Sequence, residues 1–156
     1  MAEVPLPWEL PLFVAAAGGE TAKITRLLQE EGRGVNFRHE ASGRTALCWA
    51  AENDYWDAVK LLIHRNADVN ARDNQGRTPL AQAAAHGHAG VINELVVAGA
   101  SIETRDALGL TPLMLAAQGA SDRAVRALLA AGADPNVQNT EGLGRTPLSR
   151  SGRARL

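Results

Sequence analysis

Hydrophobic and polar positions along this chain repeat with a period of 33 residues. The segment 43–51 (GRTALCWAA) recurs at 76–84 (GRTPLAQAA) and again at 109–117 (GLTPLMLAA). A second, apolar pattern follows each of these segments in the same register. Its members are Val59, Leu62 and Ile63, then Ile92, Leu95 and Val96, then Val125, Leu128 and Leu129. Three copies in one register indicate a repeat protein.

Each period predicts two helices followed by an extended loop. Thr78 is suited to cap a helix, and Pro79 is suited to its first position. The alanine pair that follows allows a second element to approach closely. A glycine such as Gly87 ends this short helix, and apolar residues spaced i, i+3 and i+4 predict the next one. Because one such unit cannot bury its own apolar face, the units must stack.

The sequence resembles the ankyrin-repeat family. The resemblance rests on segment 78–80 (TPL), the alanine pair 83–84, the GH pair 87–88, the GA pair 99–100, and Asp106 with Gly109. It implies an all-α repeat solenoid, in which stacked helix-turn-helix ankyrin repeats are joined by extended loops with tight turns. It also implies a non-enzymatic protein-interaction role.

The repeat register predicts four complete units and a partial fifth. The predicted divisions are an N-terminal arm 1–9, a first repeat 10–39 acting as N-terminal cap, repeats 40–72, 73–105 and 106–138, a partial repeat 139–149, and a basic tail 150–156. The tail is either disordered or carries an address or a kinase target.

The unfinished fifth repeat has three explanations. The chain is a fragment of a longer array, a natural short form, or a protein whose end a partner covers. A shortened form of a longer array is the favoured explanation. Two hypotheses for the function follow. The chain is a self-sufficient adaptor or inhibitor, or it is a truncated ankyrin-repeat protein whose effector region is missing. We expect a monomer unless this end self-associates.

Composition narrows the classes of partner. The formal net charge is −1, with 16 basic and 17 acidic residues, which disfavours a general nucleic-acid binder. Apolar stretches are interrupted within about ten residues, well short of the ~20 that a membrane-spanning helix needs. The single cysteine, Cys48, excludes an internal disulfide and favours a reducing compartment. We therefore expect a cytoplasmic or nuclear protein that binds neither nucleic acid nor membrane.

Enzymatic chemistry finds little support in the sequence. His86 and His88 flank Gly87 and suggest a metal pair, but the family uses Gly-His as its ordinary turn and no third ligand lies nearby in sequence. Cys48 is expected to be a small buried side chain rather than a nucleophile. We therefore predict no catalytic residue, no metal and no cofactor.

The repeats depart from the family motif Thr-Pro-Leu-His in every copy. Cys48, Ala81 and Met114 stand where the histidine is usual. Because that histidine usually bonds neighbouring loops together, its absence leaves the rigidity of the loops in question.

The resemblance also implies which face binds a partner. In ankyrin repeats the loop tips and the first helix of each unit line a concave face. The residues predicted to bind a partner are Arg44, Trp49, Glu52, Trp56, Arg72, Asn74, Gln75, Arg77, His86, Arg105, Leu108, Leu110 and Gln118.

Two rows of equivalent positions are rich in arginine. One row comprises Arg44, Arg77, Leu110 and Arg145, and the other comprises His39, Arg72, Arg105 and Gln138. Stacked units lie about 8–10 Å apart, so the basic members form a ladder. Either the ladder binds an acidic stretch of a protein partner through arginine forks, or Arg72 and Arg105 merely pair with the adjacent Asp73 and Asp106.

The remaining candidates are apolar or aromatic. Leu108 and Leu110 are predicted at a loop tip, where together they form a small hot spot beside the arginines. Trp49 lies on a predicted first helix and is assigned either to packing or to recognition, with packing favoured. Trp56 is placed in the turn between two helices and is expected to be partly exposed, as a second contact site.

Overall fold

The computed structural model describes residues 9–30 and 34–139. These residues form eight α-helices and no β-strand. The helices are α1 (Glu9–Ala17), α2 (Thr21–Glu30), α3 (Ala46–Glu52), α4 (Trp56–His64), α5 (Pro79–Ala85), α6 (Ala89–Val97), α7 (Pro112–Gln118) and α8 (Asp122–Ala130). The predicted all-α repeat solenoid is confirmed. Residues 1–8 of the predicted arm, residues 140–149 of the partial repeat and the basic tail lie outside the described residues.

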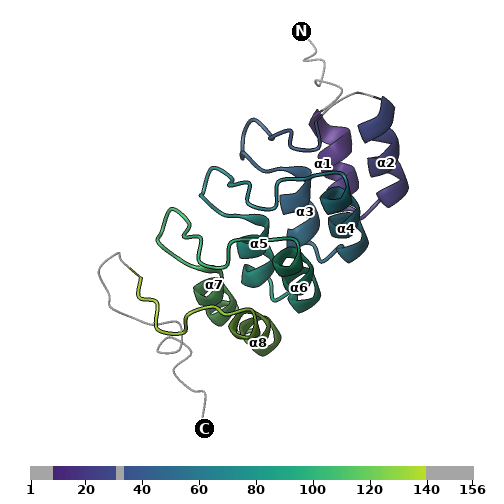
Figure 1. Ribbon diagram of the computed structural model, residues 1–156. Helices are drawn as coiled ribbons and strands as arrows, with labels where there is room; N and C mark the ends of the chain where they lie inside the picture. The colour runs from purple at the N-terminus through teal and green to yellow at the C-terminus, as the bar shows by residue number, and fades with distance from the viewer. Residues whose placement is uncertain (1–8, 31–33, 140–156) are drawn as a thin grey trace.

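The helices form two layers along one axis. The first helices α1, α3, α5 and α7 pack on one another, and the second helices α2, α4, α6 and α8 do the same (Figure 1). Each first helix also packs against the second helix of its own repeat. The loops that join successive repeats all project from one side of the stack (Figure 1). None of the described helices is long and apolar enough to span a membrane.

A threonine caps the start of each first helix after α1. The hydroxyl oxygens of Thr45, Thr78 and Thr111 accept hydrogen bonds from the backbone N–H three residues later, at 3.2–3.4 Å. Each threonine thereby binds an N–H group that the helix itself leaves unpaired. Pro79 and Pro112 occupy the first helical positions, where their missing N–H group has no cost.

Small side chains make the stacking possible. Ala50 and Ala51 of α3 and Ala83 and Ala84 of α5 are fully buried, and so is Ala116 of α7. Methyl groups let neighbouring first helices approach closely, and leucine or isoleucine of the second helices fills the wider space behind them. The larger fully buried side chains of that outer layer are Ile24, Val59, Leu62, Val91, Ile92, Leu95 and Leu128.

The turn between the two helices of a repeat needs one residue with positive φ. Gly19 and Gly87 supply it without strain, whereas Asp54 (φ 62°) and Ala120 (φ 53°) supply it with a side chain attached. Glycine at position 19 has a second reason, because a Cβ atom there would overlap the ring of Tyr55 from the next repeat.

The strained turn predicts a stabilising substitution. Ala120 is exposed, so Ala120→Gly removes no packing contact, and a left-handed conformation costs alanine about 1–2 kcal/mol. Part of that gain is offset by the greater freedom of glycine in the unfolded chain. We expect Ala120→Gly to raise the free energy of unfolding by about 0.5 kcal/mol, measured by urea denaturation. Ala127→Gly, inside α8, is the control and should lower it by about 1 kcal/mol. Equal losses in the two variants would contradict the assignment of strain to residue 120.

Candidate functional site

Arg44 is held inside the fold rather than presented to solvent. Its Nη1 donates to Glu52 Oε2 at 2.6 Å, and its Nε lies 3.5 Å from Asp73 Oδ2 of the next repeat. The guanidinium also lies over the ring of Trp49, 4.7 Å from the ring centroid. Only 17 % of the Arg44 side chain is exposed, so most of its donors and its charge already have partners.

Asp73 is the centre of a buried polar cluster. Its Oδ1 accepts the backbone N–H groups of Gln75 and Arg77, both at 2.9 Å, which closes the tight turn of its loop. Its Oδ2 accepts Nε2 of the fully buried Gln82 at 3.0 Å and faces Arg44. A single carboxylate therefore joins its own loop, its own first helix and the preceding loop.

The next repeat builds the same turn and ion pair, with Leu115 in place of the buried amide. Asp106 Oδ1 accepts the N–H groups of Leu108 and Leu110, both at 2.9 Å, and Arg77 Nε donates to Asp106 Oδ2 at 3.3 Å. Arg44 and Arg77, termed here the inner arginine pair, each bind the buried aspartate of the following repeat. The pairing suggested for Arg72 and Arg105 with Asp73 and Asp106 is wrong, because the inner pair makes those contacts.

The predicted exposure of Leu110 is also wrong. Leu110 is 8 % exposed and packs with Ala81, Met114 and Leu115 in a small apolar cluster of its own. It stands where Arg44 and Arg77 stand in earlier repeats, and the acid of the following repeat is replaced by Asn139. Cation and acid are thus lost together, and an apolar cluster takes the place of the ion pair.

The other arginines bridge the loops through backbone carbonyl groups. Arg72 Nη2 donates to the carbonyl oxygen of Arg105 at 2.6 Å, and Arg105 Nη1 donates to that of Gln138 at 3.0 Å. Arg38 Nη2 makes the equivalent bond to the carbonyl oxygen of Arg72 at 2.6 Å. Arg38, Arg72 and Arg105 are termed here the outer arginine ladder.

Arg38 and not His39 belongs to this row because the first loop is one residue longer. The turn closes from His39 N–H to the Arg44 carbonyl, whereas the next two close from Asp73 to Arg77 and from Asp106 to Leu110. His39 therefore occupies the position of Asp73, and the row assigned from sequence spacing was shifted by one residue at its first member.

The loops are joined despite the missing motif histidine. The N–H of Asn74 donates to the Ser42 carbonyl at 2.9 Å, and the N–H of Ala107 donates to the Gln75 carbonyl at 2.8 Å. The Asn74 side chain adds a bond to the Ala41 carbonyl. These bonds and the outer arginine ladder connect consecutive loops.

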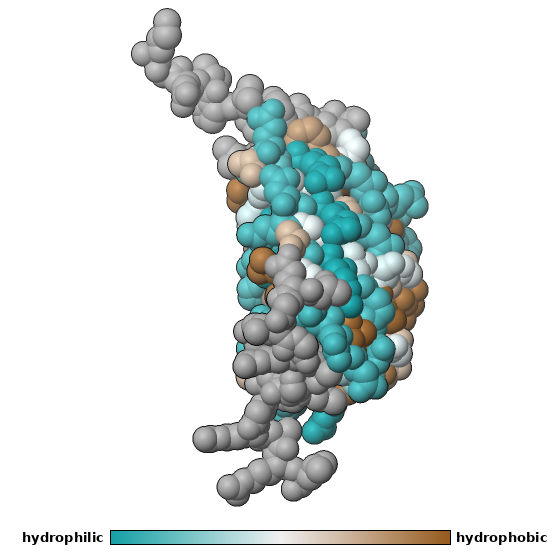
Figure 2. Space-filling model, turned by 90° about the vertical axis from the view of Figure 1, so that its left-hand side faces the viewer, coloured by the Kyte–Doolittle hydropathy of each residue, from teal (hydrophilic) through white to brown (hydrophobic). Residues whose placement is uncertain are grey.

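The loop tips and first helices present the exposed candidates. Asn74, Gln75 and Leu108 lie at the tips, and Leu108 is 57 % exposed. His86 and Gln118, at or just after the ends of α5 and α7, are also exposed. Figure 2 looks onto the side from which the loops project and shows hydrophilic residues in a band along the stack.

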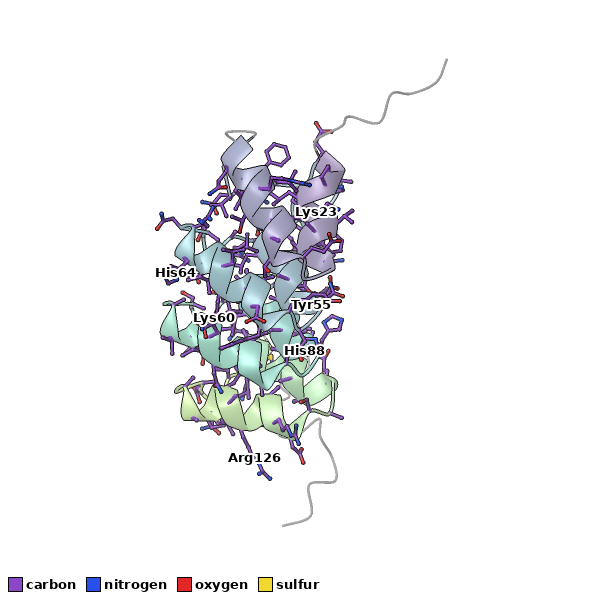
Figure 3. All side chains as sticks on the ribbon, turned by 90° about the vertical axis from the view of Figure 1, so that its right-hand side faces the viewer. Lys23, Tyr55, Lys60, His64, His88 and Arg126 are labelled. Carbon is purple, nitrogen blue, oxygen red and sulfur yellow. The ribbon has the colours of Figure 1, made fainter. Side chains whose placement is uncertain are left out.

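The tryptophans differ in their surroundings. Trp49 is half-buried against the core, and its buried Nε1 has no hydrogen-bond partner among the described residues. Trp56 is 44 % exposed, as expected, but it is the first residue of α4 rather than part of the turn. Lys60 Nζ lies 4.2 Å from the centroid of the Trp56 ring. Trp56 and Lys60 both belong to α4 and therefore share a surface on the layer of second helices, where Lys60 is labelled in Figure 3.

His88 connects adjacent repeats, whereas His86 bonds within its own repeat. His88 Nε2 lies 2.8 Å from the Glu52 carbonyl, and His86 Nδ1 lies 3.0 Å from the Gln82 carbonyl. Since a carbonyl oxygen only accepts, each of these ring nitrogens carries a proton. His88 and Tyr55 occupy equivalent turn positions and lie one above the other along the stack (Figure 3). Among the described residues, no group of three or more metal-ligating side chains is placed to hold an ion.

Cys48 is fully buried on α3. Burial raises the pKa of its thiol, and the hydrogen bonds with Thr45 only partly oppose this effect. A thiol with a raised pKa is a poor nucleophile.

Sequence reasoning missed the buried acids Asp73 and Asp106 and the buried amide Gln82. A signal for the acids was present in the printed sequence. Three pairs of residues lie 29 positions apart at equivalent places in successive repeats. The first two pairs are an arginine and an aspartate, Arg44 with Asp73 and Arg77 with Asp106. In the third pair, Leu110 with Asn139, both charges are absent. Gln82 gave no such signal, because Trp49 and Leu115 stand at its equivalent positions.

The inner arginine pair predicts a compensating double substitution. Arg77→Leu leaves the buried Asp106 carboxylate without its cation, and we expect the free energy of unfolding to fall by about 2 kcal/mol. Adding Asp106→Asn reproduces the Leu110 and Asn139 combination and should recover at least half of that loss, measured by urea denaturation. A double variant less stable than Arg77→Leu alone would show that the pair is not an independent unit.

The buried thiol predicts slow labelling and a defined pH dependence. We expect Cys48 to react with a disulfide reagent at pH 8 at least ~100-fold more slowly in the folded chain than in urea, because the thiolate forms only on opening. Since the folded pKa is raised, the thiol contributes the same stability at every pH below the unfolded pKa of about 8.5. That stability is lost as the pH rises above this value. Cys48→Ser should remove the alkaline loss, and an unchanged alkaline slope would contradict the assignment.

Comparison with known proteins identifies the family. The model of ankyrin repeats in three copies matches residues 7–73 and 66–139. The human ankyrin repeat domain-containing protein 63 is 43 % identical over 67 residues, which is 41 % of this chain and 17 % of that protein.

Two further relatives show the same partial coverage. The mouse cortactin-binding protein 2 is 42 % identical over 59 residues, covering 38 % of this chain and 4 % of that protein. The alpha-latrocrustotoxin-Lt1a of Latrodectus tredecimguttatus is 40 % identical over 65 residues, covering 42 % of this chain and 4 % of that protein. The chain thus spans less than a fifth of the length of these relatives. The stacked helix pairs, the threonine caps and the family match together establish that this chain belongs to the ankyrin-repeat family.

Proposed function

We propose that this chain is a non-enzymatic interaction module, an adaptor or an inhibitor, that binds a folded protein through its concave face and loop tips. Ankyrin repeats are generally protein-interaction modules, and a repeat stack offers an extended surface for a partner. The single buried thiol fits a reducing compartment, so we place this activity in the cytoplasm or the nucleus.

The observation that carries the proposal is that some side chains of each loop are buried and hold the loop in place, while others at its tip are exposed. The fold uses the buried side chains of Asp73, Asp106 and Gln82 to fix the loops, and it leaves the tips beyond them exposed. Leu108 is the clearest case, because an apolar side chain 57 % exposed on a hydrogen-bonded turn has no role in the core. Exposed side chains on a fixed backbone bind with a small loss of conformational entropy.

The proposed contact surface consists of the exposed candidates on the loop tips and first helices, apart from Arg72, which bonds the next loop, and Trp56, which lies on α4. Asn74, Gln75, Leu108, His86 and Gln118 form the proposed contact surface, with Trp49 and Glu52 half-buried at its base. Leu110 is excluded by burial. Arg44 and Arg77 are assigned to the fold, because their charges are matched by Glu52, Asp73 and Asp106.

A matched pair of triple variants tests the proposal. A binder to the folded chain is first selected from a displayed library of small protein domains, and its affinity is measured by calorimetry. We expect Gln75→Ala, Leu108→Ala and Gln118→Ala together to weaken binding at least ~10-fold, which corresponds to about 1.4 kcal/mol.

The control carries the same chemistry on the second helices. Gln29→Ala, Asn93→Ala and Val97→Ala also remove two amides and one exposed aliphatic side chain. We expect this control to bind within ~2-fold of the unmodified chain, with both variants retaining the melting temperature. Stronger loss in the control would move the binding face to the second helices and overturn the proposal.

A further inference from the structure

Two members of the outer arginine ladder, Arg72 and Arg105, each bond both to their own turn and to the next repeat. Arg72 Nε donates to the Gly76 carbonyl of its own turn at 3.2 Å, while its Nη2 bonds the next repeat. Arg105 Nη1 likewise bonds the Gly109 carbonyl at 2.9 Å and the Gln138 carbonyl at 3.0 Å. The guanidinium groups of Arg72 and Arg105 are therefore fixed before any partner arrives, and that of Arg38 is anchored by its single bond to the Arg72 carbonyl.

These arginines keep their charge unmatched. None of the three has an ion pair with any residue in the part of the chain that the structure describes. The adjacent acids Asp73 and Asp106 are buried and bound to the inner arginine pair. Carbonyl groups carry no net charge, so the bonds that fix the guanidinium groups leave each of them fully cationic.

The other nearby carboxylates among the described residues form no ion pair with the outer arginine ladder. Glu103 accepts the Asp134 N–H at 2.7 Å, Asp134 accepts the Asn136 N–H at 2.8 Å, and Asp68 accepts the Asn70 N–H at 2.9 Å. Glu40 lies in the first loop and is exposed to solvent.

Donors remain for a ligand. A guanidinium carries five N–H groups in a planar fork. Arg38 and Arg72 are exposed and Arg105 is half-buried, and the backbone bonds use one or two of the five in each case. Each ladder member therefore retains N–H groups for a carboxylate oxygen.

The spacing of the ladder matches an extended peptide. Its members lie one repeat apart, and stacked helices of this kind are separated by about 8–10 Å. An extended chain in the polyproline II conformation rises about 3.1 Å per residue and has about three residues per turn, so three residues of a peptide cover one repeat and bring the side chain back to the same face. Arg38, Arg72 and Arg105 thus match acidic side chains at positions i, i+3 and i+6.

We propose that the outer arginine ladder binds an extended acidic peptide segment with a carboxylate at every third residue, laid along the loops parallel to the stack. This inference rests on the proposed protein-binding function and names the chemistry of one segment of the partner. The hydrophilic band on the loop side of the molecule is the surface that such a segment would follow (Figure 2).

A single-stranded nucleic acid fits this surface less well. Such ligands are bound by basic grooves with aromatic side chains on which bases stack. The large aromatic residues that are exposed among the described residues, Tyr55 and Trp56, lie at the turn between α3 and α4 and at the start of α4, and not on the loops. The formal net charge of −1 also gives no general attraction for phosphates.

Two synthetic peptides of identical composition test the spacing. Each has ten residues with three glutamates among glycine and serine, placed at every third position in one peptide and consecutively in the other. Binding to the folded chain is followed by NMR titration at about 50 mM salt. We expect the spaced peptide to bind at least ~5-fold more tightly than the clustered one, and to weaken as salt is added.

Charge-removing variants test the residues. Arg38→Gln and Arg72→Gln should each weaken binding of the spaced peptide by about 3-fold, a size typical of one exposed ion pair. The matched control is Arg126→Gln on α8, which changes the net charge equally on the layer of second helices (Figure 3) and should leave binding unchanged. Arg72→Lys distinguishes the effect of the charge from the effect of the hydrogen bonds that join the loops. It keeps a cation at position 72 but loses the two-sided guanidinium contact with the Gly76 and Arg105 carbonyls.

The outcomes are decisive in either direction. Binding by Arg72→Lys that is tighter than by Arg72→Gln, at matched melting temperatures, supports the ladder as a charged site. Equal binding of the two peptides, equal loss in the α8 control, or tighter binding of a thymidine oligonucleotide would overturn it. If the peptide fails while a selected protein still depends on Gln75, Leu108 and Gln118, the inference falls and the proposed function stands. If the spaced peptide binds as expected while the selected protein does not depend on Gln75, Leu108 and Gln118, the proposed concave-face function falls.

Discussion

Close stacking of alanine-rich helices is the constraint on which the rest of the structure depends. A unit of 33 residues buries too little apolar surface to fold alone, so each repeat is stabilised by its neighbours. Methyl groups at Ala50, Ala51, Ala83, Ala84 and Ala116 bring the first helices close enough for the loops above them to meet. The hydrogen bonds between loops are possible only at that separation.

The arginines then divide into two sets with different physical roles. Arg44 and Arg77 are drawn inward by buried carboxylates, and their loss would leave those carboxylates unpaired. Arg38, Arg72 and Arg105 bond only to carbonyl oxygens and stay cationic at the surface. One set connects the repeats electrostatically, and the other presents a charge at every repeat along the stack.

Sequence reasoning predicted the fold because the repeat signal is redundant. Threonine caps, alanine pairs and apolar spacings each recur, so an error in one copy is corrected by the others. Individual side-chain environments lack this redundancy. Leu110 reads as an exposed tip residue because its predecessors are Arg44 and Arg77, and only the structure shows that it joins Met114 and Leu115 in a buried cluster.

The candidate site was predicted in outline and not in detail. The tip residues Asn74, Gln75 and Leu108 are exposed where the family resemblance placed them. The register of the outer arginine ladder was misassigned by one residue, because the extra residue in the first loop is visible only from its turn hydrogen bond. The arginine partners of Asp73 and Asp106 lie 29 residues away in sequence, beyond what local patterns report.

The central claim is that buried carboxylates fix the loops as a rigid frame for binding. Native-state hydrogen exchange of the amides of Gln75, Arg77, Leu108 and Leu110 tests it directly, because these N–H groups donate to Asp73 and Asp106. The account predicts that they exchange only on global unfolding, with the same opening free energy as the amide of Leu62 in the core. Exchange of these four amides through local opening, far faster than at Leu62, would contradict it.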